Sequence, residues 1–156
     1  MLINLRGDPP AAFAYLSGQL GHHVRDSPGW MRIATLRETV RMYAGQRPDL
    51  ELLERAADSA LAEGDLEAPG RVSNVYKARL AFGGARPALD FLLDRIGRLH
   101  AIGMGSPAHD LRAEAAQAAI YAGDFRAAVA LADFVLERPA SFRARHQAAV
   151  RRADAL

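Results

Sequence analysis

Glycine recurs at a fixed interval of 39 residues, at Gly45, Gly84 and Gly123. An aromatic residue stands two positions before each of them: Tyr43, Phe82 and Tyr121. A constant internal period of this size is typical of stacked supersecondary units. Each unit in such a stack buries its apolar face against its neighbours, so equivalent positions carry equivalent side chains. The interval therefore restricts this chain to a repeat architecture.

Proline and glycine divide the chain into segments of helical length. Proline suits the first helical turn, where its missing N–H would have no partner, so we place the eight prolines at helix starts. Glycine takes the left-handed conformation that ends many helices, and the glycines at the opposite ends are interpreted as stops. There is no strand pattern of any length. The predicted helices are 9–21, 28–44, 47–63, 70–83, 86–101, 107–122, 125–138 and 140–154.

These segments predict an all-α fold, a right-handed stack of helical hairpins that forms an α-solenoid from a single domain, 1–156. Three full repeats are expected at 28–63, 70–101 and 107–138. A partial repeat, 1–22, precedes them, and the terminal helix 140–154 shields the end of the stack. Apolar residues recur at equivalent places in the three repeats, for example Leu53, Leu92 and Leu131. Such a register allows neighbouring hairpins to bury one continuous core.

The third repeat carries a Gly123-Asp124-Phe125 turn, an alanine three residues later and Pro139 after the second helix. This segment resembles a tetratricopeptide repeat, and the resemblance implies a non-catalytic stack whose concave groove binds peptides. The chain departs from that pattern in its period, which is 39 rather than about 34 residues. The small residue expected inside the first helix is Ala116 here, but Glu38 and Lys77 replace it in the other repeats. A HEAT-like array, with about 40–47 residues per repeat, remains an alternative.

Composition excludes several classes of function. Half of the residues are hydrophobic, yet no run approaches the roughly 18 apolar residues of a membrane span. The start of the chain lacks the basic head and long apolar stretch of a signal peptide, so we expect a cytoplasmic protein. Lys77 is the sole lysine among 20 basic residues, and this arginine bias indicates a GC-rich bacterial genome. A net charge of +2 argues against nucleic-acid or membrane binding by the whole domain.

No motif for catalysis or metal binding is present. The absence of cysteine excludes thiolate chemistry. His22 and His23 are adjacent, so they point about 100° apart on a helix and are expected to cap the end of helix 9–21. His100, His109 and His146 lie apart in the sequence, without ligand spacing. We therefore expect no enzyme activity, no cofactor and no metal.

The resemblance implies that the first helix of each hairpin lines the groove. Arg32 and Arg71 stand one period apart, and together with Asn74 their planar donors could bind a carboxylate. The predicted peptide- or partner-binding residues are Arg32, Thr35, Thr39, Tyr43, Arg71, Asn74 and Phe82.

The leading hypothesis is a non-catalytic module that binds a peptide, a partner protein or a second copy of itself. Self-association is expected through the N-terminal end, where the apolar Leu2, Ile3 and Leu5 precede helix 9–21. The alternative is the sensor region of a bacterial transcriptional regulator, whose basic C-terminal helix contacts nucleic acid. The arginines in question are Arg138, Arg143, Arg145, Arg151 and Arg152.

Overall fold

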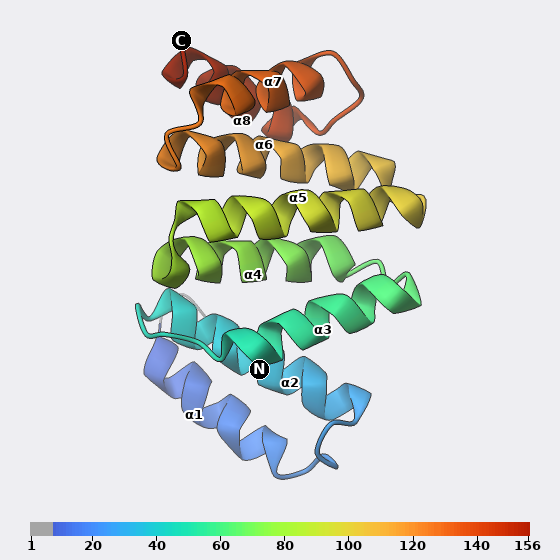
Figure 1. Ribbon diagram of the computed structural model, residues 1–156. Helices are drawn as coiled ribbons and strands as arrows, with labels where there is room; N and C mark the ends of the chain where they lie inside the picture. The colour runs from blue at the N-terminus through green and yellow to red at the C-terminus, as the bar shows by residue number, and fades with distance from the viewer. Residues whose placement is uncertain (1–7) are drawn as a thin grey trace. The chain divides into compact units, whose positions relative to one another are not determined.

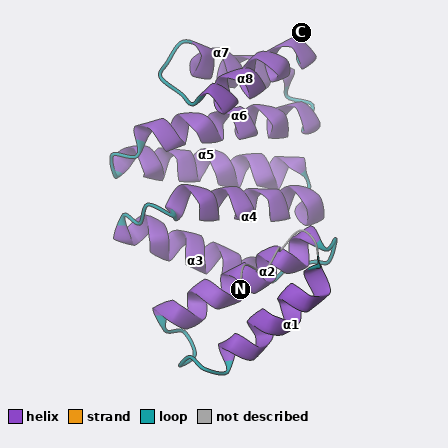
Figure 2. Ribbon diagram, turned by 180° about the vertical axis from the view of Figure 1, so that it is seen from behind, coloured by secondary structure: helices purple, strands orange, loops and turns teal. Residues whose placement is uncertain are grey.

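The structure is a computed structural model that describes residues 8–156, and all regular structure in that range is helical (Figures 1 and 2). The predictions of an all-α fold and of eight helices are confirmed for this range. The helices are α1 (Pro9–Leu20), α2 (Pro28–Tyr43), α3 (Leu50–Glu63), α4 (Ala68–Gly83), α5 (Ala85–Ala101), α6 (Gly105–Tyr121), α7 (Phe125–Leu136) and α8 (Phe142–Asp154). None of the described helices is long and apolar enough to cross a membrane.

The chain divides into two compact units, Met1–Ser59 and Ala60–Leu156. Their boundary falls inside α3, where neither proline nor glycine interrupts the sequence. The single domain and the continuous solenoid therefore stay predictions. The apolar residues Leu2, Ile3 and Leu5, on which the predicted self-association depends, lie outside the described residues.

In the first unit, α1 packs against α2 through a small apolar cluster. Ala12, Leu16 and Val40 are buried there, with Phe13 and Ile33 packed beside them. Both helices begin as local chemistry predicts, because each has proline in its first turn and a side-chain cap before it. The Asp8 carboxylate accepts from the N–H of Ala11, and the Ser27 hydroxyl accepts from the N–H of Trp30.

Glu38 is fully buried on α2 and connects this helix to the start of α3. Its carboxylate accepts hydrogen bonds from Arg37, at 2.9 and 3.1 Å, and from Arg41, at 3.1 Å. It also accepts from the backbone N–H of Asp49, at 2.9 Å. Because buried charges are tolerated only when they are paired, these contacts explain how glutamate occupies a position where the resemblance expects a small residue.

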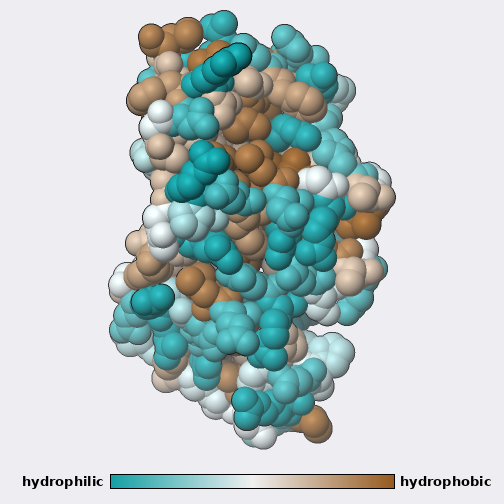
Figure 3. Space-filling model, in the orientation of Figure 1, coloured by the Kyte–Doolittle hydropathy of each residue, from teal (hydrophilic) through white to brown (hydrophobic). Residues whose placement is uncertain are grey.

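The second unit contains α4 to α8. Consecutive helices pack side by side from α4 to α7, and α8 covers both α6 and α7 (Figure 1). Alanine dominates the contact between the last three helices and permits their close approach. The buried cluster consists of Ala113, Ala116, Ala132, Val135, Ala144 and Ala148. On the face seen in Figure 3, apolar side chains are visible between hydrophilic ones over this part of the chain.

The three periodic glycines all have positive φ, but they form two kinds of turn. Gly45 and Gly123 both have φ of 75° and end their helices with paired backbone hydrogen bonds of the Schellman type. Gly84 has φ of 96° and ψ of 165°, and it alone joins α4 to α5. Gly21, the last residue of the predicted helix 9–21, does not take the left-handed conformation, since its φ is −65°. The 39-residue period therefore marks helix ends without fixing a single turn geometry.

Two helix ends differ from the predicted bounds. α6 begins at Gly105 and not at residue 107, so Ser106 lies inside the helix. α1 ends at Leu20, and His22 and His23 directly follow its C-cap residue, Gly21. The His23 ring lies close to Gly29 at the start of α2, and a Cβ on that glycine would approach Nδ1 to 2.7 Å.

Candidate functional site

A hollow of about 440 Å³ lies along the N-terminal half of α4. Because residues three and four apart share a helix face, Gly70, Asn74 and Lys77 lie on one side of α4. The hollow is lined by Leu66, Glu67, Gly70, Arg71, Ser73, Asn74 and Lys77. Two of the predicted binding residues, Arg71 and Asn74, therefore meet in one place. Lys77 joins them, although the sequence analysis did not assign it to the site.

Acidic neighbours hold the Arg71 guanidinium in place. Its Nη2 lies 3.0 Å from a carboxylate oxygen of Glu67 and 3.6 Å from one of Asp65. The pairs are only partly exposed, so they balance the arginine charge more strongly than a fully solvated pair would. The side chain of Arg71 is therefore held in one place, and Glu67 and Asp65 balance its positive charge.

Ser73 connects this wall of the hollow to α6. Its hydroxyl donates to the Glu114 carboxylate, whose two oxygens lie 2.8 and 3.0 Å away. The neighbouring Tyr76 is buried on α4, and its hydroxyl donates to the backbone carbonyl of Glu114 at 3.1 Å. Two contacts to the same residue fix the orientation of α4 against α6. The hollow is therefore built on a rigid support.

Asn74 and Lys77 are the two polar side chains of the hollow that are available to a ligand. Within residues 8–156, neither side chain has a hydrogen bond or an ion pair. The carboxamide of asparagine can donate and accept at once, and the lysine ammonium offers three donors. Gly70 leaves the surface one turn before Asn74 open, since a Cβ there would meet no atom within 4 Å. The hollow can therefore accept a polar ligand without first breaking a contact of these two residues.

The remaining predicted residues are placed differently. Thr35 and Thr39 are buried, and their hydroxyls donate to the carbonyls of Met31 and Thr35 in their own helix. Tyr43 is 59% exposed at the end of α2. Phe82 is half-buried on α4, outside the residues that line the hollow. Arg32 lies in the first unit and Arg71 in the second, so their predicted pairing stays a prediction.

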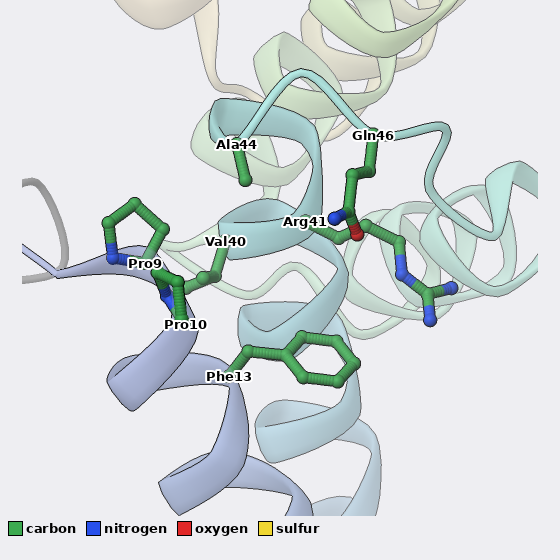
Figure 4. Close-up of a pocket in the computed structure, with 7 residues that line it drawn as sticks. All are labelled: Pro9, Pro10, Phe13, Val40, Arg41, Ala44 and Gln46. Carbon is green, nitrogen blue, oxygen red and sulfur yellow. The ribbon is translucent and has the colours of Figure 1, made fainter.

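A second hollow, of about 310 Å³, lies in the first unit between the start of α1 and the end of α2 (Figure 4). Pro9, Pro10, Phe13, Val40, Arg41, Ala44 and Gln46 line it. The Arg41 guanidinium lies 5.2 Å from the centre of the Phe13 ring, within the range of a cation–π contact. Since Arg41 also binds buried Glu38, its first role is to stabilise the unit.

His100 and His109 lie apart in the sequence, but the α5–α6 hairpin brings their ring centres to 5.2 Å. The nitrogen His100 Nε2 is 2.7 Å from Arg112, so it accepts a hydrogen bond and carries no proton. The pKa of His100 is lowered by desolvation, then by the charge of Arg112 and by His109. The described residues contain no group of three or more histidines and acids that could hold a metal.

No known family model, curated protein or solved structure matches this chain. The comparisons therefore assign no family, and the resemblance to tetratricopeptide repeats stays a prediction.

Proposed function

We propose that this chain is a non-catalytic interaction module that binds a peptide segment of a partner protein in the α4 hollow. The observation that carries the proposal is the pair of uncommitted side chains, Asn74 and Lys77, beside the positioned guanidinium of Arg71. A binding site needs a few well-placed polar groups in a concave surface, and this hollow provides them.

The charges of the hollow favour one kind of peptide. Asp65 and Glu67 offset the charge of Arg71, which leaves Lys77 as the cation available to a ligand. Lys77 can bind one carboxylate, while the Asn74 carboxamide can pair with the donor and acceptor of a peptide backbone. We therefore expect an extended segment with a single acidic side chain, and weaker binding of strongly acidic segments because Glu67 would repel them.

The test is selection from a peptide display library on the immobilised full chain. The selected peptides are then titrated by fluorescence anisotropy against the Asn74→Ala/Lys77→Ala variant. Loss of two polar contacts should weaken binding by about a hundredfold, since each contributes roughly 1.4 kcal/mol. The control is Arg126→Ala, which removes an exposed cation from α7. Equal affinity for the wild type and the double variant would contradict the proposal.

The second candidate function is a nucleic-acid contact by the basic terminal helix. Phe142 is 89% exposed at the start of α8, and its ring stacks on His146 at 6.5 Å, next to Arg143 and Arg145. Exposed rings beside arginines are typical of single-strand binding surfaces. Arg151 and Arg152, by contrast, form ion pairs with Asp154 and Asp133.

This candidate predicts binding that falls steeply as salt rises, because phosphate contacts release counterions. Gel-shift assays with a labelled single-stranded oligonucleotide at low and physiological salt provide the measurement. Phe142→Ala should weaken the binding, whereas Arg151→Ala should change it less because Arg151 is already paired. Unchanged migration at low salt would remove this function.

A further inference from the structure

In the second unit, three basic side chains contact the ring of Phe134, and a fourth, His100, contacts two of these three. His100 lies in the last turn of α5, His109 and Arg112 lie on α6, and Arg138 follows α7. The carbon Cζ of Arg112 is 4.1 Å from the centre of the Phe134 ring, and that of Arg138 is 3.6 Å away. The His109 ring meets the edge of Phe134 at 5.4 Å. We call these four basic residues and Phe134 the basic cluster.

The hydrogen bonds define the state of one ring nitrogen in each histidine. His109 Nδ1 lies 2.8 Å from the carbonyl oxygen of Pro139, which can only accept, so this nitrogen carries the proton. His100 Nε2 accepts from Arg112, so its proton is on the other nitrogen. The His100 imidazole is therefore neutral in this arrangement. The two guanidiniums supply permanent positive charge to the cluster.

Acidic residues do little to balance that charge. Glu137 lies 3.8 Å from Arg138 and its side chain is 73% exposed, so this pair is weak. Within residues 8–156, no carboxylate contacts Arg112. The pKa of Arg112 is lowered by burial and then by the like charge of Arg138. The like charges of Arg112 and Arg138 beside one ring thus repel each other, and an anion that contacts both guanidiniums would relieve that repulsion.

We propose that the basic cluster binds a phosphate group, with Arg112 and Arg138 as its principal donors. Each guanidinium has five N–H donors, and the contacts of Arg112 and Arg138 within the chain use few of them. A planar guanidinium matches the oxygens of phosphate in pairs, and two guanidiniums balance its charge of about −1.5 to −2. A single carboxylate would balance the charge of only one of the two guanidiniums.

The source of the phosphate is either a phosphorylated segment of a partner protein or a free phosphorylated metabolite. Both present the same monoester group, so the same residues would bind either. This inference does not depend on peptide binding in the α4 hollow, because the two sites share no residue. The failure of one proposal would therefore leave the other in place.

The test is a titration of the full chain with inorganic phosphate, phosphoserine peptide and adenosine monophosphate in separate arms at constant ionic strength. The imidazole carbon-bound protons of His100 and His109 are followed by nuclear magnetic resonance. Saturable shifts of both histidines in any arm support the proposal. A higher affinity for the phosphoserine peptide or for adenosine monophosphate then identifies the source. Shifts that remain linear with concentration in all three arms would overturn it.

Variants separate this site from general charge effects. Arg138 is exposed, so Arg138→Gln should keep the fold and weaken phosphate binding by about tenfold through loss of one charge-assisted contact. Arg138→Lys keeps the charge but loses the paired donors and should recover only part of that affinity. The control Arg126→Gln removes an exposed arginine elsewhere in the same unit. Equal losses in Arg138→Gln and the control would refute the assignment.

Discussion

Replacing Gly84 by alanine tests whether the 39-residue period has a backbone cause. Gly84 has φ of 96° and ψ of 165°, in a region that almost only glycine occupies. A Cβ there would meet no atom within 4 Å, so the cost comes from the backbone alone and not from a clash. We expect Gly84→Ala to lower the free energy of unfolding by about 1–3 kcal/mol.

Two further glycines in the same unit serve as references. Gly123→Ala should cost about 1–2 kcal/mol, because its φ of 75° is in the ordinary left-handed region. Gly97 lies inside α5 with nothing within 4 Å of a Cβ, so Gly97→Ala should instead gain up to about 1 kcal/mol. Urea unfolding followed by circular dichroism, compared at equal denaturant dependence, measures the three values. Equal free energies of unfolding for the Gly84→Ala and Gly97→Ala variants would refute the reasoning.

Three other predictions concern buried or shifted groups. Glu38→Ala leaves the backbone N–H of Asp49 and two arginines without their partner. It should lower the free energy of unfolding, measured in urea, by about 1–3 kcal/mol. A change near zero would contradict the described contacts. His100 should titrate below its ordinary pKa of 6.5 in a nuclear magnetic resonance experiment. The folded chain favours the neutral form of His100, so this residue contributes stability above pH 6.5, and the contribution is lost as the pH falls below it. A pKa of His100 above 6.5 would contradict this geometry. Burial and then the charge of Glu114 raise the pKa of Tyr76 well above its usual value of 10.0. In an absorbance titration the wild type should therefore retain un-ionised Tyr76 well above pH 10 as long as the chain is folded, so Tyr76→Phe should leave the titration near pH 10 unchanged. A smaller absorbance change in Tyr76→Phe near pH 10 would show that this prediction is wrong.

Local chemistry explains why the helices could be predicted. Proline at the first turn and the Ser27 cap act within a few residues, so the sequence alone places α2 correctly. α6 was misplaced because Ser106-Pro107 has the pattern of a cap, while Met104 precedes the helix in the structure. The unit boundary inside α3 has no local signal, since contact patterns and not residue types define it.

The sites were only partly predictable. Arg71 and Asn74 were predicted from the repeat register, and both line the α4 hollow. Lys77 could have been added because it lies three residues after Asn74 on the same helix face. The basic cluster was missed because its members come from several elements and meet only after packing. One signal was available: His100 and His109 flank the Gly103 turn, and a short turn between antiparallel helices brings such residues together.

The most direct test of the proposed function is a map of chemical shifts when a selected peptide is added to the isotopically labelled full chain. We predict that the side-chain amide of Asn74 and the ammonium of Lys77 shift together and saturate at the same peptide concentration, because both line the α4 hollow. A saturating response that leaves Asn74 and Lys77 unchanged would contradict the proposal that this hollow is the binding site.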